Sequence, residues 1–562
     1  MSETPPILIA GAGPVGLVLA LCLRQNGVPV RIIDKDLTHH VRARASGIMP
    51  RTLEIYNFLG ILSDVMKASR PAPTLCNYEL PGGTKVASTF PMFVYNEPRP
   101  DRPYLNVRTL AQNITMSILR SYLAKLDCEV ELGTALDSFE DRGDHILAKL
   151  VRKASDGTEV TESYTASYLV GADGSHSIVR KRLNIAFDGE PFEQMNMLFA
   201  DVRIRGIENT HWNKWGELAD CMVTIRKTEN EDSYWLLAGG GNFDPTSVRG
   251  EPEYLTEWIG KMTGRDDIKV VAVQTFANYK PQMRMVQQFS KGRVYLAGDA
   301  AHVHSPAGGQ GMNNGVGDAY ALAWRLSLAY RNLASEGLLS SYTEERAPII
   351  KGMLERTTAL LKKASIEWGS FGTLANEDPK RKHKLPLYQL DLHYRWSRVV
   401  SEETSYTRRA IGDEDEDDLV RAGDRAPDAP GLVDLSPTES SMKTLFQYFK
   451  PTHHTALIFS SSETAIEAFV SALAVVPANV VRSVVILPGD TVVRADNIDS
   501  DFAWRSRVDH VLKDCGTHAY KIYAVDLSKG DAAIIVRPDG MVGAIVEGAD
   551  SIKRYFRNIL RV

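Results

Sequence analysis

The sequence predicts an α/β fold in which an antiparallel sheet is inserted into a domain built around a parallel sheet, with a second α/β domain behind it. Three observations lead to this expectation. The chain opens on an apolar strand, a glycine-rich turn, an apolar helix and a second strand within residues 7–33. From about residue 190 to 275, short strand-like segments are separated by turn residues. Beyond about residue 425, strands and helices alternate again.

The opening segment has the pattern of a dinucleotide-binding unit. Residues 7–10 are a short apolar run typical of a buried strand, and Gly11, Gly13 and Gly16 follow in G-x-G-x-x-G spacing. The second strand, at 30–33, ends at Asp34, where an acid can accept hydrogen bonds from a ribose. Strand, spacing, helix and acid coincide, so we expect a Rossmann-like dinucleotide site. Its expected contacts are Gly11, Gly13, Pro14, Val15, Gly16, Asp34 and Lys35.

The middle of the chain predicts an inserted sheet and then a return to the first domain. Strand-like segments lie at 198–204, 222–225 and 234–238, and a buried strand at 292–299 leads into a long helix at 311–332. A further helix is expected at 349–367. The acidic run at 413–418 and the Pro-rich stretch at 423–430 indicate a solvated connector, so we place a boundary there.

The last segment predicts a separable α/β domain. Strands are expected at 454–459, 480–487 and 521–525, with helices at 463–475 and 549–560. Residues 532–536 and 542–546 predict a hairpin around the turn at 538–540. The expected domains are the dinucleotide-binding domain at 1–190 and 276–365, the inserted sheet at 191–275, a helical connector and acidic linker at 366–424, and the C-terminal domain at 425–562.

Composition excludes several classes of function. The net charge is -5, with 65 basic and 70 acidic residues, so a nucleic-acid partner is not expected. The five cysteines include no C-x-x-C pair, which argues against a zinc site and a redox dithiol, and their odd number argues against a disulfide framework. A reduced, cytoplasmic compartment is therefore expected. The apolar run at 7–23 contains glycines and a proline and lacks a basic leader, so neither a membrane span nor a signal peptide is expected.

Two later motifs, together with the first, give the chain a resemblance to a known family. The second contains Asp173, Gly174 and Arg180, and the third runs from Gly298-Asp299 to Gly311-Met312-Asn313. With these three motifs in order, residues 7–365 resemble the FAD-dependent single-component aromatic hydroxylases, the family of phenol hydroxylase and 4-hydroxybenzoate hydroxylase. The tail resembles the thioredoxin-like C-terminal domain of the phenol hydroxylase branch. The inserted sheet is then the substrate sheet.

The resemblance implies a flavoprotein monooxygenase with non-covalent FAD. Such an enzyme uses NADPH or NADH and O2 to hydroxylate a small phenolic substrate through a flavin C4a-hydroperoxide, and it is commonly a homodimer. Asp299 would accept hydrogen bonds from the ribityl hydroxyls, and the helix end at Gly311, Met312 and Asn313 would favour the negative charge of reduced flavin.

Further FAD and nicotinamide contacts are implied by the resemblance alone. Arg44 would lie along the flavin phosphates, and Arg108 or Gln112 would contact the ribityl chain. Asp173 and Gly174 would lie near the pyrophosphate, with Arg180 as a charge partner for nicotinamide docking. The alternatives are a surface ion pair for Arg180 and a structural helix cap for Asp299.

The catalytic candidates are Tyr279, Pro306 and His304. Tyr279 is expected to hydrogen-bond the phenol, and the backbone of Pro306 to lie on the flavin side. Where phenol hydroxylases commonly carry an aspartate, this chain has Ser46, which cannot serve as a carboxylate base. Deprotonation would then need Tyr279, His304 or a water chain. No metal is expected, because no Cys or acidic cluster completes a site with His302 and His304.

Two other functions remain open from the sequence. The same scaffold can support epoxidation or a Baeyer–Villiger-type oxidation of a natural-product intermediate, and a flavin-binding protein can be regulatory without turnover. The residues name neither the substrate nor the position of hydroxylation, and they do not distinguish NADPH from NADH.

Overall fold

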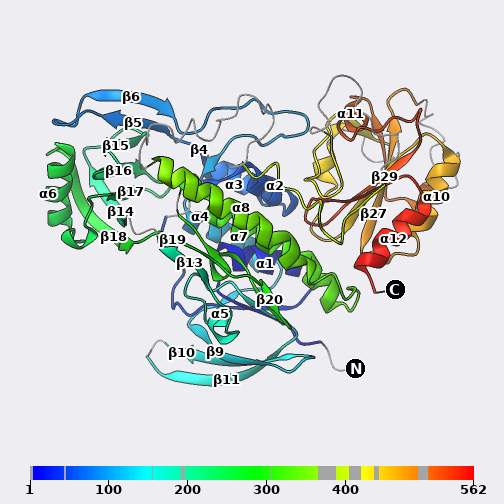
Figure 1. Cartoon of the computed structure of the whole chain (residues 1–562), viewed down its shortest axis with the longest axis horizontal. Coiled ribbons are helices and arrows are strands. Elements are labelled where there is room, and N and C mark those ends of the chain that lie inside the picture. Colours follow the sequence, from blue (N-terminus) through cyan, green and yellow to red (C-terminus); the bar gives the residue numbers. More distant parts are fainter. Residues whose placement is uncertain are drawn as a thin grey trace.

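The computed structural model describes residues 4–43, 46–154, 156–191, 196–305, 307–364, 388–403, 419–435, 442–491 and 504–561. Arg44, Pro306, the acidic run at 413–418 and most of the expected connector at 366–424 lie outside the described residues. The chain forms three parts side by side, with the inserted sheet at one end, the first domain in the centre and the C-terminal domain at the other end (Figure 1).

The first domain is built on a six-stranded sheet of order β20-β21-β12-β1-β2-β8, in which β21 to β8 run parallel. As predicted, β1 (Ile7–Ala10) leads into α1 (Pro14–Gln25) and then β2 (Val30–Ile33). Gly27 follows α1 with a φ of +72°, the left-handed conformation that ends helices. The other strands are β8 Val130–Glu131, β12 Leu169–Gly171, β20 Ser290–Lys291 and β21 Val294–Leu296.

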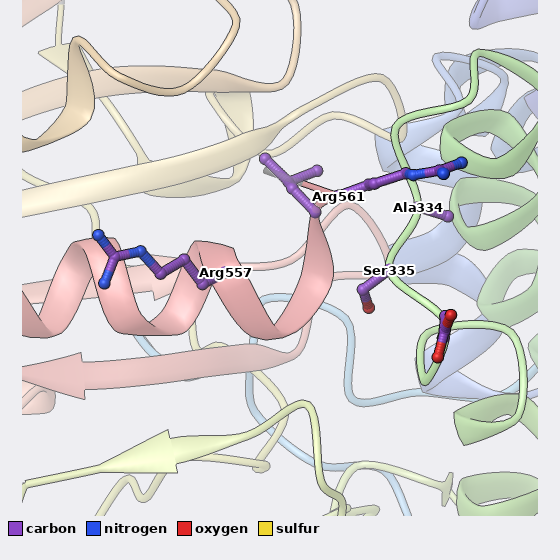
Figure 2. Close-up of a pocket in the computed structure, with 6 residues that line it drawn as sticks. Ala334, Ser335, Arg557 and Arg561 are labelled. Carbon is purple, nitrogen blue, oxygen red and sulfur yellow. The ribbon is translucent and has the colours of Figure 1, made fainter.

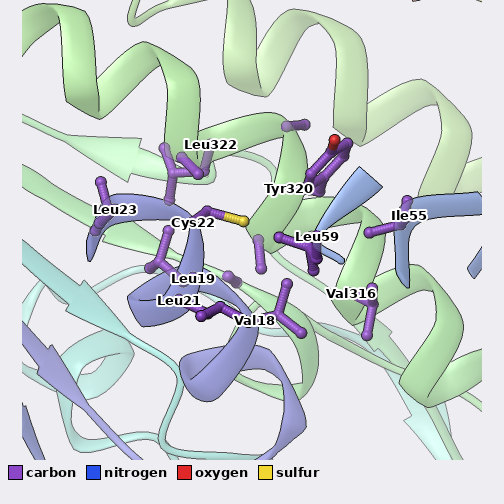
Figure 3. Packing of buried hydrophobic residues seen from close by; sticks show 14 of the residues in the cluster. Val18, Leu19, Leu21, Cys22, Leu23, Ile55, Leu59, Val316, Tyr320 and Leu322 are labelled. Carbon is purple, nitrogen blue, oxygen red and sulfur yellow. The ribbon is translucent and has the colours of Figure 1, made fainter. Parts of the chain in front are cut away.

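Helices α1 and α7 (Gln310–Tyr330) form the core of this domain. Leu19 and Cys22 of α1 meet Val316 and Tyr320 of α7, with Ile55 of α2 (Pro50–Phe58) beside them (Figure 3). Burial raises the pKa of the Cys22 thiol, so this cysteine is an apolar core residue. The predicted helix at 311–332 is confirmed, and α8 (Ser341–Ala364) covers it (Figure 1).

Smaller elements complete this domain. Three-stranded sheets are formed by β9 to β11, by β13, β19 and β22, and by β3, β4 and β7. Their bounds are β3 Gly47–Ile48, β4 Arg70–Pro71, β7 Arg108–Thr109, β9 Thr134–Asp141, β10 Ile146–Lys153, β11 Glu159–Ala166, β13 Asp188–Pro191, β19 Gln282–Met285 and β22 His302–Val303. The remaining helices are α3 Leu62–Ala68, α4 Gln112–Ala124 and α5 Ile178–Arg182.

The inserted sheet has seven strands in the order β18-β14-β17-β16-β15-β5-β6, and α6 (Pro252–Thr263) packs on one face. It is wider than the predicted segment of 191–275. Two strands come from earlier in the chain because β5 pairs in parallel with β15, and β18 runs on to Tyr279. The strands are β5 Thr74–Tyr78, β6 Val86–Pro91, β14 Asn196–Arg205, β15 Trp212–Gly216, β16 Met222–Lys227, β17 Tyr234–Gly240 and β18 Lys269–Tyr279.

The C-terminal part contains an eight-stranded sheet of order β23-β30-β29-β26-β27-β28-β24-β25. The predicted hairpin around Gly540 is confirmed. Its strands are β23 Ser401–Glu402, β24 Leu432–Asp434, β25 Met442–Lys443, β26 His454–Phe459, β27 Val481–Pro488, β28 His510–Asp514, β29 Ala532–Val536 and β30 Val542–Val546. Its helices are α10 Glu463–Leu473, α11 His518–Ile522 and α12 Ala549–Ile559.

The strand predicted at 521–525 is wrong. The carboxylate of Asp514 accepts hydrogen bonds from the backbone N–H groups of His518 and Tyr520, both at 3.1 Å. These bonds satisfy donors at the start of α11, so a short helix forms where the alternating sequence pattern favoured a strand.

The expected solvated connector is also wrong for residues 422–430, most of which are buried. Arg425 donates to Glu54 of α2 at 3.0 Å, and the Asp428 carboxylate accepts from the backbone N–H of Phe446 at 2.9 Å. Arg537 donates to both carboxylate oxygens of Glu345 in α8, at 2.7 and 2.8 Å. Buried ion pairs therefore fix the C-terminal part on the first domain, which contradicts a separable unit.

The chain end lies at the seam between these parts. Leu560 pairs with Ala334 just beyond α7, beside a surface hollow whose labelled residues include Ser335, Arg557 and Arg561 (Figure 2). Among the described residues, every helix is too short or too polar to cross a membrane.

His454, at the start of β26, makes the stability of the fold depend on pH. Its ring packs edge-on against Trp324 and Phe556, each with centroids 5.5 Å away, and burial lowers its pKa from 6.5 to about 3. Between these values the unfolded chain binds a proton that the folded chain does not. We expect the free energy of unfolding to fall by roughly 1.4 kcal/mol per pH unit from this group as pH drops from 6.5 towards 3.

Urea titrations at several pH values check this expectation. His454→Gln should flatten the pH dependence of the unfolding free energy below pH 6.5, whereas His176→Gln, which changes an exposed histidine, should leave it as in the wild type. Identical slopes in the two variants would contradict the assignment.

Candidate active site

The three sequence motifs meet at the carboxyl edge of the parallel sheet. A β-carbon on Gly11 would lie 2.3 Å from the carbonyl oxygen of Ala172, so the first motif passes directly beside the second. A β-carbon on Gly16 would lie 2.0 Å from the carbonyl oxygen of Gly11, so the turn itself requires glycine. Gly13 instead has open space where its β-carbon would be. That opening at the α1 N-terminus leaves room for a phosphate group to approach the backbone.

Asp34 is fixed at the end of β2 as predicted. Its carboxylate accepts hydrogen bonds from the backbone N–H of Ala12 at 2.8 Å and of Asp36 at 3.0 Å. The adjoining Lys35 is exposed. The acid therefore lies against the glycine turn, in the position from which it can accept from a ribose hydroxyl.

Val15 connects the first motif to the third. β-carbons on Gly298 and Gly315 would lie 2.7 and 2.6 Å from the Val15 side chain, so only glycine fits on either side of it. Gly298 also has a φ of +61°. It opens a short 3-10 helix in which Asp299 is exposed while Ala300 is buried. Asp299 is thus exposed at the edge of the expected dinucleotide site.

A fully buried carboxylate holds the third motif in place. Asp318 of α7 accepts from the backbone N–H of Gly298 at 3.0 Å, from His302 Nε2 at 2.7 Å and from Arg346 Nε at 2.7 Å. Burial opposes its ionisation, but Arg346 and His302 outweigh that effect and lower its pKa. No sequence motif predicts this role of Asp318, and His302 was considered only as a metal ligand that the sequence does not favour.

The N-terminus of α7 is open for an anion. Gly309, with a φ of +62°, precedes the helix and provides no side-chain cap. Asn313 is occupied elsewhere: its Oδ1 accepts from Thr52 and Met49, and its Nδ2 donates to Gly47 and Gly309. Met312 is buried in the core. The first-turn N–H groups at Gly311 and Met312, rather than the Asn313 side chain, are therefore the feature that favours negative charge.

The second motif is held by buried groups. Asp173 Oδ2 accepts from the backbone N–H of Ile178 at 2.7 Å, whereas its buried Oδ1 has no hydrogen-bond partner among the described residues. Burial raises the pKa of Asp173, against the hydrogen bonds from Ser177 and Val179. Gly174 has a φ of +78°. An orphaned carboxylate oxygen beside the glycine turn indicates a site for a donor on a bound ligand.

Arg180 is not a surface ion-pair residue, because only 5% of it is exposed. It donates to the carbonyl oxygens of Ala300 at 2.8 Å and Ser175 at 2.7 Å, and its guanidinium lies 3.8 Å from the centroid of the Phe187 ring. It therefore ties the second motif to the third.

The two ribityl candidates lie on neighbouring elements. Arg108 of β7 donates to the Ser69 hydroxyl at 3.0 Å and to the Ser69 carbonyl at 2.8 Å. Gln112 is the first residue of α4, and its amide lies 3.6 Å from the sulfur of Met116.

The face of the inserted sheet turned away from α6, which we call the inner face, meets these motifs. Leu198, Leu236 and Ile225 pack towards α6, so the alternating residues point the other way. Aromatic rings cross this face in series: Tyr279 to Phe199, Phe199 to Trp235 and Trp235 to Trp212, with centroids 5.4, 5.5 and 5.4 Å apart. The inner-face residues include Met197, Phe199, Asp201, Trp212, Lys214, Met222, Thr224, Arg226, Trp235, Leu237 and Tyr279.

Tyr279 and His304, two of the catalytic candidates, lie in contact. The Tyr279 hydroxyl donates to the carbonyl oxygen of His304 at 3.2 Å. His304 Nδ1 lies 2.5 Å from the carbonyl oxygen of Ser305, which can only accept, so Nδ1 carries the proton. Nε2 is then an acceptor without a partner among the described residues, 3.2 Å from where a β-carbon on Gly311 would lie. Burial, helped by His302, lowers the pKa of His304 to about 4, so the ring is neutral near pH 7.

The inner face also contacts Ala43 and Ser46 of the first domain. Arg226 Nη2 donates to the Ser46 hydroxyl at 2.8 Å, and the backbone N–H of Ala43 donates to Asp201 at 3.3 Å. Neither Arg226 nor Asp201 is among the residues predicted from the sequence. Period-2 alternation along β14 and β16 assigns each residue to one face of its own strand, and strand pairing then brings that face together with the aromatic rings.

These residues fit a bound dinucleotide. The Gly13 opening, the uncapped α7 end and the orphaned Asp173 oxygen provide space, donors and an acceptor around one edge of the sheet. Among the described residues, no three His, Cys, Asp or Glu side chains gather closely enough to hold a metal ion.

Comparisons with known proteins agree with this geometry. A family model described as an FAD binding domain matches residues 4–357. A flavin-dependent monooxygenase of Mycobacteroides abscessus is 32% identical over 468 residues, which are 82% of this chain and 90% of that protein. Pentachlorophenol 4-monooxygenase of Sphingobium chlorophenolicum is 31% identical over 364 residues, 64% of this chain and 65% of that protein.

A solved structure shares the whole fold. The complex of aklavinone-11 hydroxylase with FAD and aklavinone superposes with a TM-score of 0.76 over 99% of both chains, at 22% sequence identity. At that identity the likeness concerns the fold alone.

Asp299→Ala should weaken FAD binding without unfolding the protein. It removes a carboxylate that can accept hydrogen bonds from ribityl hydroxyls, each worth about 1.5–3 kcal/mol, so the Kd for FAD should rise roughly tenfold to a hundredfold. Titration of flavin-free protein followed by flavin fluorescence measures the Kd. An unchanged Kd would remove Asp299 from the flavin site.

Asp318→Asn should destabilise the whole first domain. The amide keeps the shape of the side chain but leaves the buried Arg346 guanidinium without its counter-charge, at a cost of about 3–5 kcal/mol in unfolding free energy. Urea unfolding compares it with Asp266→Asn, which changes an exposed carboxylate and should have little effect. Equal stability of the two variants would show that Asp318 does not hold this motif.

Proposed function

Because this chain belongs to the FAD-binding family of flavin-dependent aromatic monooxygenases, we propose that it hydroxylates an aromatic ring that already carries a hydroxyl group, using NAD(P)H and O2. The observation that carries the proposal is the meeting of the aromatic inner face with the third motif, where Tyr279 donates to the backbone of His304. An aromatic ligand on this face would lie beside the α7 end that favours negative charge.

The chain's own residues would hold the cofactor. Gly13 and the α1 end suit the pyrophosphate, Asp34 suits the adenosine ribose, and Asp299 suits the ribityl chain. Bound FAD supplies the redox chemistry that joins NAD(P)H oxidation to activation of O2. Arg44 is proposed to lie along the phosphates and Arg108 or Gln112 by the ribityl chain, as the resemblance implies. Arg180 is proposed to act by positioning the Ala300 backbone next to Asp299.

Tyr279 is proposed to orient the substrate hydroxyl. Its O–H donates to His304, so its oxygen lone pairs can accept a hydrogen bond from the phenol. His304 is neutral and presents Nε2 as an acceptor, which suits hydrogen bonding better than proton storage at a pKa of about 4. Ser46 accepts from Arg226, so its hydroxyl has a structural partner. The backbone of Pro306 remains a proposed flavin contact.

The C-terminal part is proposed to be thioredoxin-like without a redox role. The topology supports this: β26, β27 and β28 run parallel, and β29 and β30 add an antiparallel hairpin. Cys515 is an exposed thiol that forms no disulfide. A homodimer is proposed from the family resemblance, and light scattering tests it.

A panel of phenols tests the proposed activity. Addition of a substrate should accelerate NAD(P)H oxidation by the FAD-loaded protein, and the product should be heavier by one oxygen atom. Mass spectrometry and product structure distinguish a new ring hydroxyl from an epoxide or a Baeyer–Villiger ester, which are the alternatives on this scaffold. Turnover that yields only hydrogen peroxide with every phenol would contradict the proposal.

Tyr279→Phe should uncouple the reaction. Loss of the hydroxyl removes the proposed partner of the phenol and the bond to His304, so NAD(P)H use should yield less product and more hydrogen peroxide. We expect a severalfold lower ratio of product to NAD(P)H with normal FAD content. Phe243→Tyr, a change on the α6 side of the sheet, serves as a control. Unchanged coupling in Tyr279→Phe would exclude Tyr279 from the site.

A further inference from the structure

The inner face ends in a compact polar group opposite to Tyr279, and the proposed function gives this group no task. It consists of Trp212, Thr224, Arg226 and Glu229, which we call the Arg226 cluster. Trp212 is the cross-strand partner of Arg226, and Thr224 lies two residues before Arg226 on the same face of β16. Arg226 Nη1 lies 3.2 Å from Glu229 Oε1, and its guanidinium carbon lies 5.8 Å from the centroid of the Trp212 ring.

Three polar atoms of this cluster are buried and have no hydrogen-bond partner among the described residues. They are Trp212 Nε1, Thr224 Oγ1 and Glu229 Oε2. Thr224 is 1% exposed and the side chain of Glu229 is 2% exposed. Buried polar groups are rarely left unpaired, because each lost hydrogen bond is costly. Three in one cluster indicate a ligand that supplies the missing partners.

The chemistry of these atoms defines that ligand. The indole N–H only donates, the ionised carboxylate only accepts, and the threonine hydroxyl can do either. Arg226 Nη1 donates to the other carboxylate oxygen, Oε1, and so orients the Glu229 side chain. A hydroxyl group matches this set, since a hydroxyl can accept from an indole N–H and donate to a carboxylate. A halogen or a methyl group cannot.

The aromatic rings connect this cluster to the proposed reaction end. Trp212 is the last of the four stacked and edge-on rings that lead from Tyr279 through Phe199 and Trp235. Each step between centroids exceeds 5 Å, so the row is longer than a single benzene ring. Both ends also contact the first domain, through His304 at one end and Ser46 at the other.

We propose that the substrate lies along this row of rings, with the reacting ring at Tyr279 and a second, remote hydroxyl bound by Glu229 and Trp212. The inference rests on the proposed function and names its substrate class: an aromatic compound of at least two rings with hydroxyl groups at opposite ends. Glu229 and Trp212 are then specificity-determining residues, remote from the oxygen-transfer chemistry.

Calorimetric titration of the FAD-loaded protein with three naphthalenes tests the proposal. The probes are 2,6-dihydroxynaphthalene, 6-methoxy-2-naphthol and 2-naphthol. The methoxy group keeps the acceptor for Trp212 but removes the donor for Glu229. We expect the diol to bind at least tenfold more tightly than the methoxy compound, because a carboxylate built to accept from a hydroxyl discriminates strongly against an analogue that lacks it.

Substitutions test whether the Arg226 cluster causes the difference in affinity between the diol and the methoxy compound. Glu229→Gln should bring the ratio of the two Kd values to within about threefold, whereas Trp212→Phe should weaken both ligands and preserve the ratio. Glu231→Gln changes an exposed carboxylate in the same turn and should behave as wild type. Equal binding of the diol and the methoxy compound by the wild type, no binding of the diol, or an unchanged ratio in Glu229→Gln would each overturn the proposal. These experiments measure binding alone. A result that overturns this proposal therefore does not decide the proposed function, which phenol-stimulated NAD(P)H oxidation tests separately.

Discussion

The buried Asp318 carboxylate is the interaction on which the arrangement of the site depends. It receives hydrogen bonds from the backbone of Gly298, from His302 and from Arg346, so it fixes the segment that carries Asp299 and His304. An isolated carboxylate in the same place would be unstable, because its desolvation is compensated only when charged partners and donors surround it. The α7 helix thus has two roles. Its N-terminus favours negative charge, and Asp318 in its third turn fixes the segment that lies opposite this N-terminus.

Buried ion pairs of α8 also connect the C-terminal part to the first domain. Glu345 and Arg346 are neighbours on this helix, and they join two buried networks. Arg346 pairs with Asp318, while Glu345 pairs with Arg325 of α7 and Arg537 of the C-terminal sheet. Burial opposes the ionisation of Glu345, but the two arginines outweigh it and lower its pKa to about 2. The C-terminal part is therefore a structural support for the helices that build the site.

Local sequence signals predicted the parts of the fold that depend on neighbouring residues. The unit of β1, α1 and β2 with Asp34 follows from the glycine spacing, and the hairpin at Gly540 follows from its turn residues. The strand predicted at 521–525 failed because Asp514, several residues earlier, caps a helix there. The connector failed because its charged residues find buried partners such as Glu54, far away in the sequence. The role of Asp318 could not be predicted from the sequence either, because its partners belong to other elements and no spacing rule links them to it.

In the candidate site, too, some residues could be proposed from the sequence and others could not. The glycines and Asp34 could be proposed because a known geometry requires those residue types at fixed spacing, whereas Asp299 was proposed from the motif that carries the family resemblance. Glu229 lies in the turn after β16, where no strand pattern applies. Arg226 and Asp201 were not predictable either, because a charged residue in an alternating strand is ordinarily a solvated one. Only the pairing of β14 with β17 and of β15 with β16 shows that these side chains share a face with four aromatic rings.

The inserted sheet thus has two different faces, one packed on α6 as core and one turned to the cofactor motifs, where we propose that the substrate binds. If the protein is a monooxygenase as proposed, an aromatic ring bound on this second face receives one atom of O2. Turnover under ¹⁸O2 with a phenolic substrate measures this transfer. We expect one ¹⁸O atom in each product molecule and none when the label is in water. Product oxygen derived from water, or product formed at the same rate without O2, would contradict this expectation.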